Sequence, residues 1–221
     1  MTVEEWERCG DPRDMMPQFQ YYRPFRKFRH LVCACLHTVD DELKAAQLTH
    51  FVEVVERAAN ETISEDERSD AAQELLRLEY MDLDAGQLIA TLRHALYEES
   101  EQLPSGIVAG AVWGSLSAID ELMGFNQGRF GTENGLLYSA LVRDIFGNPF
   151  RPIVFDPTWR TSTAVALARG IYDDRAFDRM PILADALQDA GCDDDELLAH
   201  CRGPRPHVRG CWVVDLVLGK N

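Results

Sequence analysis

The sequence has little positive charge, and this scarcity excludes whole classes of partner. Lysine and arginine together number 22 against 37 aspartates and glutamates in 221 residues, which gives a formal net charge of −15 and a pI near 4.7. Nucleic acids and anionic membranes expose phosphates that such a surface would repel. We therefore expect no nucleic-acid partner and no membrane partner, whereas a protein partner of unknown identity stays open.

The sequence also lacks a segment that would direct the chain to a membrane or across one. Its N-terminus is acidic where a signal peptide needs a basic region followed by an apolar run. The longest uncharged stretch, from Leu103 to Ala118, contains proline, serine and glycine, and it falls short of the ~20 apolar residues that span a bilayer. Six cysteines in a chain of this length do not make a disulfide framework, so we expect a cytoplasmic protein with reduced thiols.

Strand patterns are nearly absent. Only residues 152–155 look extended, whereas elsewhere apolar residues recur at steps of three and four, which is typical of helices. Thr2 and the Ser64-Glu-Asp-Glu capping box mark helix starts. We predict an all-α fold, a compact single domain of about ten helices over 1–221 that allows an N-terminal helical subdomain over 1–100.

Several helix boundaries can be predicted from caps and breakers. The expected helices include one opened by Pro24, one from Asp40 or Asp41 through Val55, 104–123, 133–146, 161–171, 174–190 with a break at Pro181, and a closing helix from about Pro206. The glycine-rich stretch 124–135 is expected to be a loop. It lacks the Lys-Ser/Thr pair of a phosphate-binding loop, so a connector is the favoured interpretation.

The two ends of the chain resemble a known group of sequences. The C-terminal segments are Arg143-Asp-Ile-Phe-Gly-Asn-Pro-Phe-Arg-Pro152 and the long run from Pro181-Ile-Leu-Ala-Asp to Val217-Leu-Gly-Lys220. Together with the N-terminal Glu4-Glu-Trp-Glu-Arg-Cys-Gly-Asp-Pro they resemble an uncharacterised family of hypothetical proteins from planctomycete bacteria. The likeness covers the C-terminal block 136–221 best, and the middle departs from the family's alanine-rich middle. The resemblance implies a bacterial protein and carries no activity, cofactor or catalytic residue.

The best metal candidates are four residues of the C-terminal block in the spacing H-C-x5-H-x3-C: His200, Cys201, His207 and Cys211. If the closing helix has begun by His207, then His207 and Cys211 share one of its faces, and the preceding helix end offers His200 or Cys201. Zinc takes four such N and S ligands, and Cys192 is a substitute. The alternative is that these cysteines are small buried hydrophobic residues. No cofactor is the default expectation, with zinc as the alternative.

Polar residues of the same block form a second candidate site. The ligand-binding candidates are Arg143, Asn148, Arg151, Arg175, His207, Arg209 and Asp215. The favoured interpretation is a buried network, including Asp144, that fixes the order of the helices. A ligand site is the alternative, and the positively charged tail 202–221 leaves an anionic ligand open.

Cys33 and Cys35 complete the candidates. His30 and His37 lie three before and four after Cys33, but a nucleophile and base on one helix hold a substrate poorly. Core packing is therefore the favoured interpretation of both cysteines.

No complete catalytic motif is present, so an enzyme is not the preferred interpretation. Residues 53–101 hold 14 acidic residues and 4 arginines, which places −10 of the net charge there. The preferred hypothesis is a cytoplasmic binding or scaffold protein that uses this acidic middle and the glycine-bearing segment 104–135. The alternative is a small metalloprotein or enzyme with a His/Cys or Arg/His/Asp site within 143–215.

Overall fold

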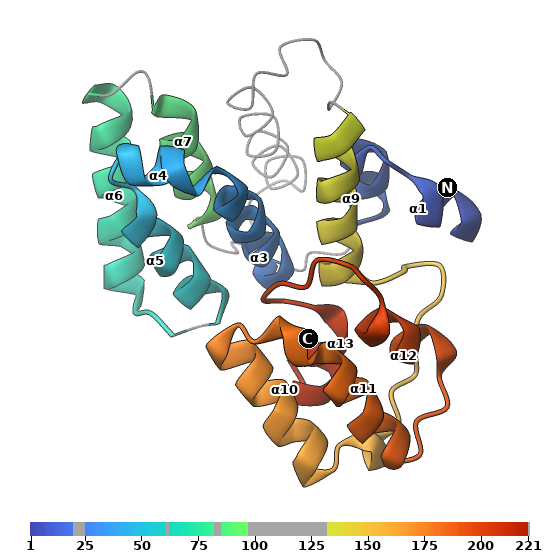
Figure 1. Cartoon of the computed structure of the whole chain (residues 1–221). Coiled ribbons are helices and arrows are strands. Elements are labelled where there is room, and N and C mark those ends of the chain that lie inside the picture. Colours follow the sequence, from blue (N-terminus) through green and yellow to red (C-terminus); the bar gives the residue numbers. More distant parts are fainter. Residues whose placement is uncertain (20–24, 61, 82–84, 97–131, 221) are drawn as a thin grey trace. The chain divides into compact units, whose positions relative to one another are not determined.

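The computed structural model describes residues 1–19, 25–60, 62–81, 85–96 and 132–220 (Figure 1). Within these residues the chain is helical and has no strand, so the predicted all-α class with about ten helices is confirmed. Residues 152–155 are irregular. None of the described helices is long and apolar enough to cross a bilayer. The expected helix 104–123 and the first part of the expected loop 124–135 lie outside the described residues.

The chain divides into two compact units. Unit 1 consists of Met1–Arg8 and Ala140–Asn221, and unit 2 consists of Cys9–Ser139. The helix α9 (Thr132–Phe146) begins in unit 2 and ends in unit 1. Residues 132–135, expected to be loop, are therefore the first turn of α9.

Unit 2 is built on packed amphipathic helices. Its α-helices before α9 are α2 (Pro12–Met15), α3 (Phe25–Leu36), α4 (Asp40–Ala45), α5 (Thr49–Ala59), α6 (Glu65–Met81) and α7 (Gly86–Ala95). α3 packs on α5 and α7, and α6 packs on α7 and α5. The predicted cap of α6 is present, because the Glu67 N–H donates to Ser64 Oγ at 3.1 Å.

One predicted helix of unit 2 is two helices. The prediction of a single helix from Asp40 through Val55 is wrong, because α4 stops at Ala45 and Gln47 adopts φ +58°. The Leu48 N–H donates to the Leu43 carbonyl at 2.8 Å and the Gln47 N–H to the Lys44 carbonyl at 3.1 Å, which is a Schellman ending. Leu43 and Leu48, on the two sides of the break, are both buried. The spacing of buried apolar residues therefore continues across the break, and the sequence pattern resembles that of one helix.

Unit 1 holds the helices of the C-terminal block around one core. They are α1 (Val3–Arg8), the end of α9, α10 (Ser162–Asp174), α11 (Met180–Asp189), α12 (Asp195–Arg202) and α13 (Trp212–Leu218). α10 packs on α11 and α13, and α12 packs on α11 and α13 (orange to red in Figure 1). Ile171, Leu183 and Val213 are fully buried between them. Thr161 and Asp194 cap α10 and α12.

Two predicted boundaries in unit 1 are wrong. The helix expected from 174 begins at Met180 instead: Arg175, at φ +53°, ends α10, and Pro181 sits in the first turn of α11, where its missing N–H costs nothing. The closing helix begins at Trp212 rather than near Pro206. Residues 203–211 are irregular and include Gly210 at φ +89°, a backbone conformation that no α-helix contains.

Candidate metal centre

Four buried side chains of unit 1 converge on one point. Asp144 lies in the last turn of α9, His200 on α12, His207 in the irregular segment 203–211, and Cys211 immediately before α13. One donor atom of each lies within 4.8 Å of the donor atoms of the other three. The side chains of Asp144, His200 and His207 are 1%, 4% and 6% exposed, and Cys211 is fully buried. A set of one oxygen, two nitrogen and one sulfur donors is thus enclosed by protein.

Asp144 lies at the middle of the group. Its Oδ1 is 2.7 Å from His207 Nδ1 and 3.2 Å from His200 Nε2, while its Oδ2 accepts the Val208 N–H at 2.9 Å. Burial raises the pKa of the Asp144 carboxyl, but the hydrogen bonds from His200 and His207 outweigh burial and hold this pKa below its usual range. Asp144 is therefore an ionised carboxylate in a dry site.

Burial favours the uncharged forms of two other donors, His200 and Cys211. Burial lowers the pKa of His200, which favours the neutral imidazole that metals bind. Burial, followed by the nearby Asp144 charge, raises the pKa of the Cys211 thiol well above its usual range. Without a cation, Cys211 therefore keeps its proton beside the ionised Asp144.

The arrangement does not fit a nucleophilic cysteine. Cys211 Sγ lies 3.3 Å from His200 Nε2, but Asp144 approaches that same nitrogen. A catalytic triad needs its carboxylate on the other ring nitrogen, and there Nδ1 of His200 accepts a hydrogen bond from the indole Nε1 of Trp212 at 3.2 Å. A buried thiol with a raised pKa is also a poor nucleophile.

The same distances fit a tetrahedral zinc ion. Zinc bonds of ~2.0–2.3 Å place N and O ligands about 3.3 Å apart and an N and S pair about 3.6 Å apart. The His200 Nε2 distances of 3.2 Å to Asp144 and 3.3 Å to Cys211 are already near these values. The 2.7 Å contact between Asp144 and His207 is shorter because a proton lies between the two atoms. The donor atoms lie up to 4.8 Å apart, so a coordination sphere requires the widest pair to move closer and the Asp144–His207 pair to separate.

A polar network alone leaves one atom of the group unsatisfied. Nε2 of His207 is buried and has no hydrogen-bond partner among the described residues. A network whose purpose is to fix helix order is expected to pair every buried polar atom, because each unpaired one costs about 1–3 kcal/mol. An ion at His207 Nδ1 would leave Nε2 equally unpaired, so this atom does not distinguish a polar network from a metal site.

Three of the four predicted metal residues come together, and Asp144 takes the place of Cys201. Adjacent helical residues point about 100° apart, so α12 directs His200 to the centre and turns Cys201 into the core, where burial raises the pKa of its thiol to about 12. Cys192 is likewise outside the group. The shared helix face expected for His207 and Cys211 is wrong, since both precede α13.

A cleft in unit 1 gathers part of the predicted ligand set. Its volume is about 360 Å³, and Arg143, Asn148 and Arg151 line it. The other lining residues are Trp6, Glu7, Gly147, Asp195, Glu196, Ala199, His200, Arg205 and Trp212. Arg143 donates to the Trp6 carbonyl through Nη2 at 2.6 Å and Nε at 3.1 Å. His200 and Trp212 thus belong both to the cleft and to the surroundings of the metal candidates.

The remaining predicted ligand residues lie elsewhere in unit 1. Arg209 donates to the carbonyls of Tyr172 and Asp173 at 3.1 and 2.9 Å and so joins the loop to the end of α10. Arg175 ends α10, and Asp215 is 1% exposed in the first turn of α13. None of these three lines the cleft. The predicted ligand set is therefore divided, and only Arg143, Asn148 and Arg151 line the cleft.

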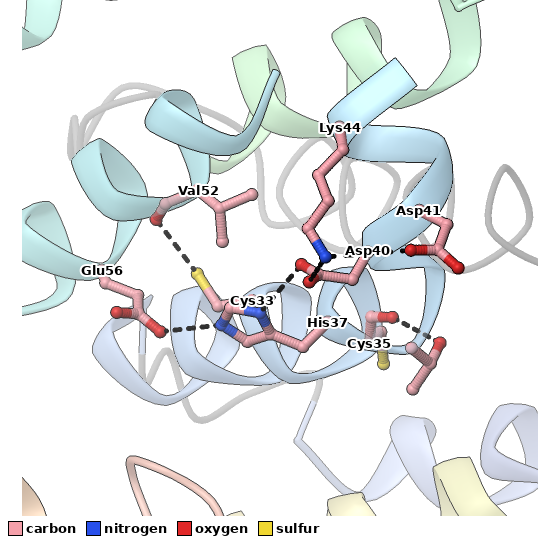
Figure 2. Close-up of polar contacts among 9 residues, drawn as sticks. Cys33, Cys35, His37, Asp40, Asp41, Lys44, Val52 and Glu56 are labelled. Carbon is pink, nitrogen blue, oxygen red and sulfur yellow. Dashed lines mark hydrogen bonds and ion pairs between the residues drawn. The ribbon is translucent and has the colours of Figure 1, made fainter. Parts of the chain in front are cut away.

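Cys33 and Cys35 pack in the core of unit 2, as the sequence indicates. Figure 2 shows the contacts of the His37 ring: its Nε2 lies 3.2 Å from Glu56 and its Nδ1 3.9 Å from Asp40. Cys33 Sγ instead lies 3.9 Å from the Val52 carbonyl. Both cysteines are buried, and burial raises the pKa of Cys35 to about 12. The contact between Cys33 and Val52 joins α3 to α5.

Comparison of the chain with protein-family models, with curated proteins and with solved structures finds no match. A functional assignment therefore depends on the geometry of unit 1.

Proposed function

We propose that this protein binds one zinc ion through Asp144 Oδ1, His200 Nε2, His207 Nδ1 and Cys211 Sγ. The observation that carries the proposal is the convergence of these four donors within 4.8 Å in a buried site. They come from three separate segments, α9, α12 and residues 203–211, and His207 and Asp144 are 63 residues apart. Chance neighbours on one helix surface would not supply such a set.

The charges of the set support a divalent cation with a soft partner. One carboxylate, one thiolate and two neutral imidazoles balance the two positive charges of zinc, so the loaded centre is neutral and burial carries little penalty. Thiolate and imidazole ligands suit zinc, whereas magnesium and calcium prefer oxygen ligands. The Val208 N–H on Asp144 Oδ2 leaves Oδ1 as the single coordinating oxygen.

The proposed role of the ion is structural. Four protein ligands fill the tetrahedron, and a catalytic zinc keeps one position open for water or substrate. The ion would join the end of α9, the end of α12, the segment 203–211 and the start of α13. The conformation of residues 203–211 would depend on the ion most, because this segment contributes no helix to the core.

The scaffold hypothesis stays a prediction. The segment 104–135, which it invokes, lies mostly outside the described residues, and no contact of the described ones favours a partner surface. A cytoplasmic location is also part of the proposal, because all six cysteines are free and a zinc-bound thiolate is kept reduced there.

Cobalt substitution tests the zinc proposal at the level of single ligands. Co²⁺ added to the metal-free full chain should give the near-ultraviolet charge-transfer band of a thiolate ligand and the visible bands of a tetrahedral ion. Cys211→Ser should lose the charge-transfer band and weaken metal binding by at least about 10-fold.

Cys201→Ser is the matched control, because Cys201 is also buried, lies beside His200 in the sequence and is outside the group. It should keep the band and the affinity. Loss of the band in Cys201→Ser with retention in Cys211→Ser would overturn the proposed ligand set.

A further inference from the structure

The bond between Trp212 and His200 determines where His200 carries its proton. The indole Nε1 of Trp212 lies 3.2 Å from His200 Nδ1. An indole nitrogen only donates, so Nδ1 of His200 must accept. The single proton of the neutral imidazole is then on Nε2, which faces Asp144 Oδ1 at 3.2 Å and Cys211 Sγ at 3.3 Å.

This pattern is the reverse of that around a metal-bound histidine. A metal at Nε2 uses the lone pair of that nitrogen, so the neutral ring must carry its proton on Nδ1. The usual partner of that N–H is an acceptor, such as a carboxylate, a carbonyl or water. In this protein the partner is a second N–H, and two donors cannot share a hydrogen bond.

We propose that Trp212 opposes zinc binding, and that loading of the centre breaks the Trp212–His200 hydrogen bond and moves the indole. This inference rests on the proposed zinc centre. Trp212 and His200 both line the 360 Å³ cleft, which supplies the space into which the indole can turn. The backbone of Gly147 closes another side, because a Cβ there would lie 3.3 Å from Cγ of the indole. Metal occupancy therefore changes the wall of the cleft.

The proposal predicts an inverted effect of a mutation. Removing the partner of a metal-bound histidine normally weakens metal binding 10- to 100-fold. Trp212→Phe removes a competing hydrogen bond instead, so zinc should bind about 2- to 12-fold more tightly, the range that one net hydrogen bond supplies. Trp159→Phe is the matched control. Trp159 is also 8% exposed and lies in the same core, but its ring packs edge-on against Phe155. The zinc affinity of Trp159→Phe should equal that of the wild type.

Competition with a chelator of known zinc affinity measures the zinc dissociation constants of the wild type and of both variants at one pH. A second readout needs no variant of the centre: the indole ¹⁵N–¹H signal of Trp212 in the full chain should shift on zinc addition while that of Trp159 stays. The Trp212 signal is assigned by its absence in Trp212→Phe, or by elimination from variants of the other three tryptophans if that protein does not fold.

The outcomes separate the two proposals. Zinc binding with unchanged or weaker affinity in Trp212→Phe, or with an unmoved Trp212 signal, overturns this inference and leaves the zinc centre standing. If neither the wild type nor the variants bind zinc, the proposed function fails and the inference fails with it.

Discussion

Asp144→Ala is expected to lower the free energy of unfolding of the metal-free protein by at least about 3 kcal/mol, because it leaves three buried donors without an acceptor at about 1–3 kcal/mol each. Three donors lose their acceptor at once: His207 Nδ1, His200 Nε2 and the Val208 N–H. No water can replace a carboxylate that is 1% exposed without the site opening. Urea unfolding in the presence of a chelator measures the change.

Asp185→Ala is the control for this prediction. Asp185 belongs to the same unit and pairs with Arg202 at 2.7 Å, but its side chain is 70% exposed. Removing an exposed ion pair should cost about 0–1 kcal/mol. Asp144→Asn should also destabilise the protein, because the asparagine NH₂ group would face the N–H groups that now donate to the carboxylate. Equal unfolding midpoints for the Asp144 and Asp185 variants would refute the central place of Asp144.

Zinc itself should produce the second large effect. An ion that binds only the folded chain stabilises it by about 4 kcal/mol when free zinc is 1,000-fold above its dissociation constant. Because burial keeps the Cys211 thiol protonated in the metal-free state, binding should also release protons into a weakly buffered solution. Thermal or urea unfolding with and without zinc, and a pH indicator, record the two signals.

The cysteine variants make this measurement specific. Cys201→Ser should be stabilised by zinc as the wild type is, whereas Cys211→Ser should gain little. A similar gain in both would mean that zinc acts at another place on the chain.

The fold could be predicted well wherever the local signals agree. Thr161 and Ser64 mark helix starts in the sequence, and the side chain of each accepts the expected hydrogen bond from a backbone N–H of the first turn. The break between α4 and α5 could not be predicted, because glutamine occupies the left-handed position where glycine is the usual signal. A pattern of buried leucines on both sides reads as one continuous helix.

The site could be predicted only in part, for reasons of topology. His200, His207 and Cys211 lie close together in the sequence, so their spacing indicates a metal site even though the expected helix face is absent. Asp144 lies 63 residues before His207 and is brought to it by the tertiary fold alone. Its sequence context offered a single clue, a carboxylate in the last turn of a predicted helix within the same C-terminal block. The sequence placed it in a polar network rather than among metal ligands.

The metal content of the protein tests the central claim most directly. The full chain, expressed without a polyhistidine tag and passed through a chelating resin, is analysed by mass spectrometry of its elements. We predict about one zinc per chain in the wild type and in Cys201→Ser. Cys211→Ser should contain much less zinc, because the loss of the thiolate ligand weakens binding at a tetrahedral centre. Zinc far below one per chain in the wild type, with no uptake on addition of zinc, would contradict the proposed centre.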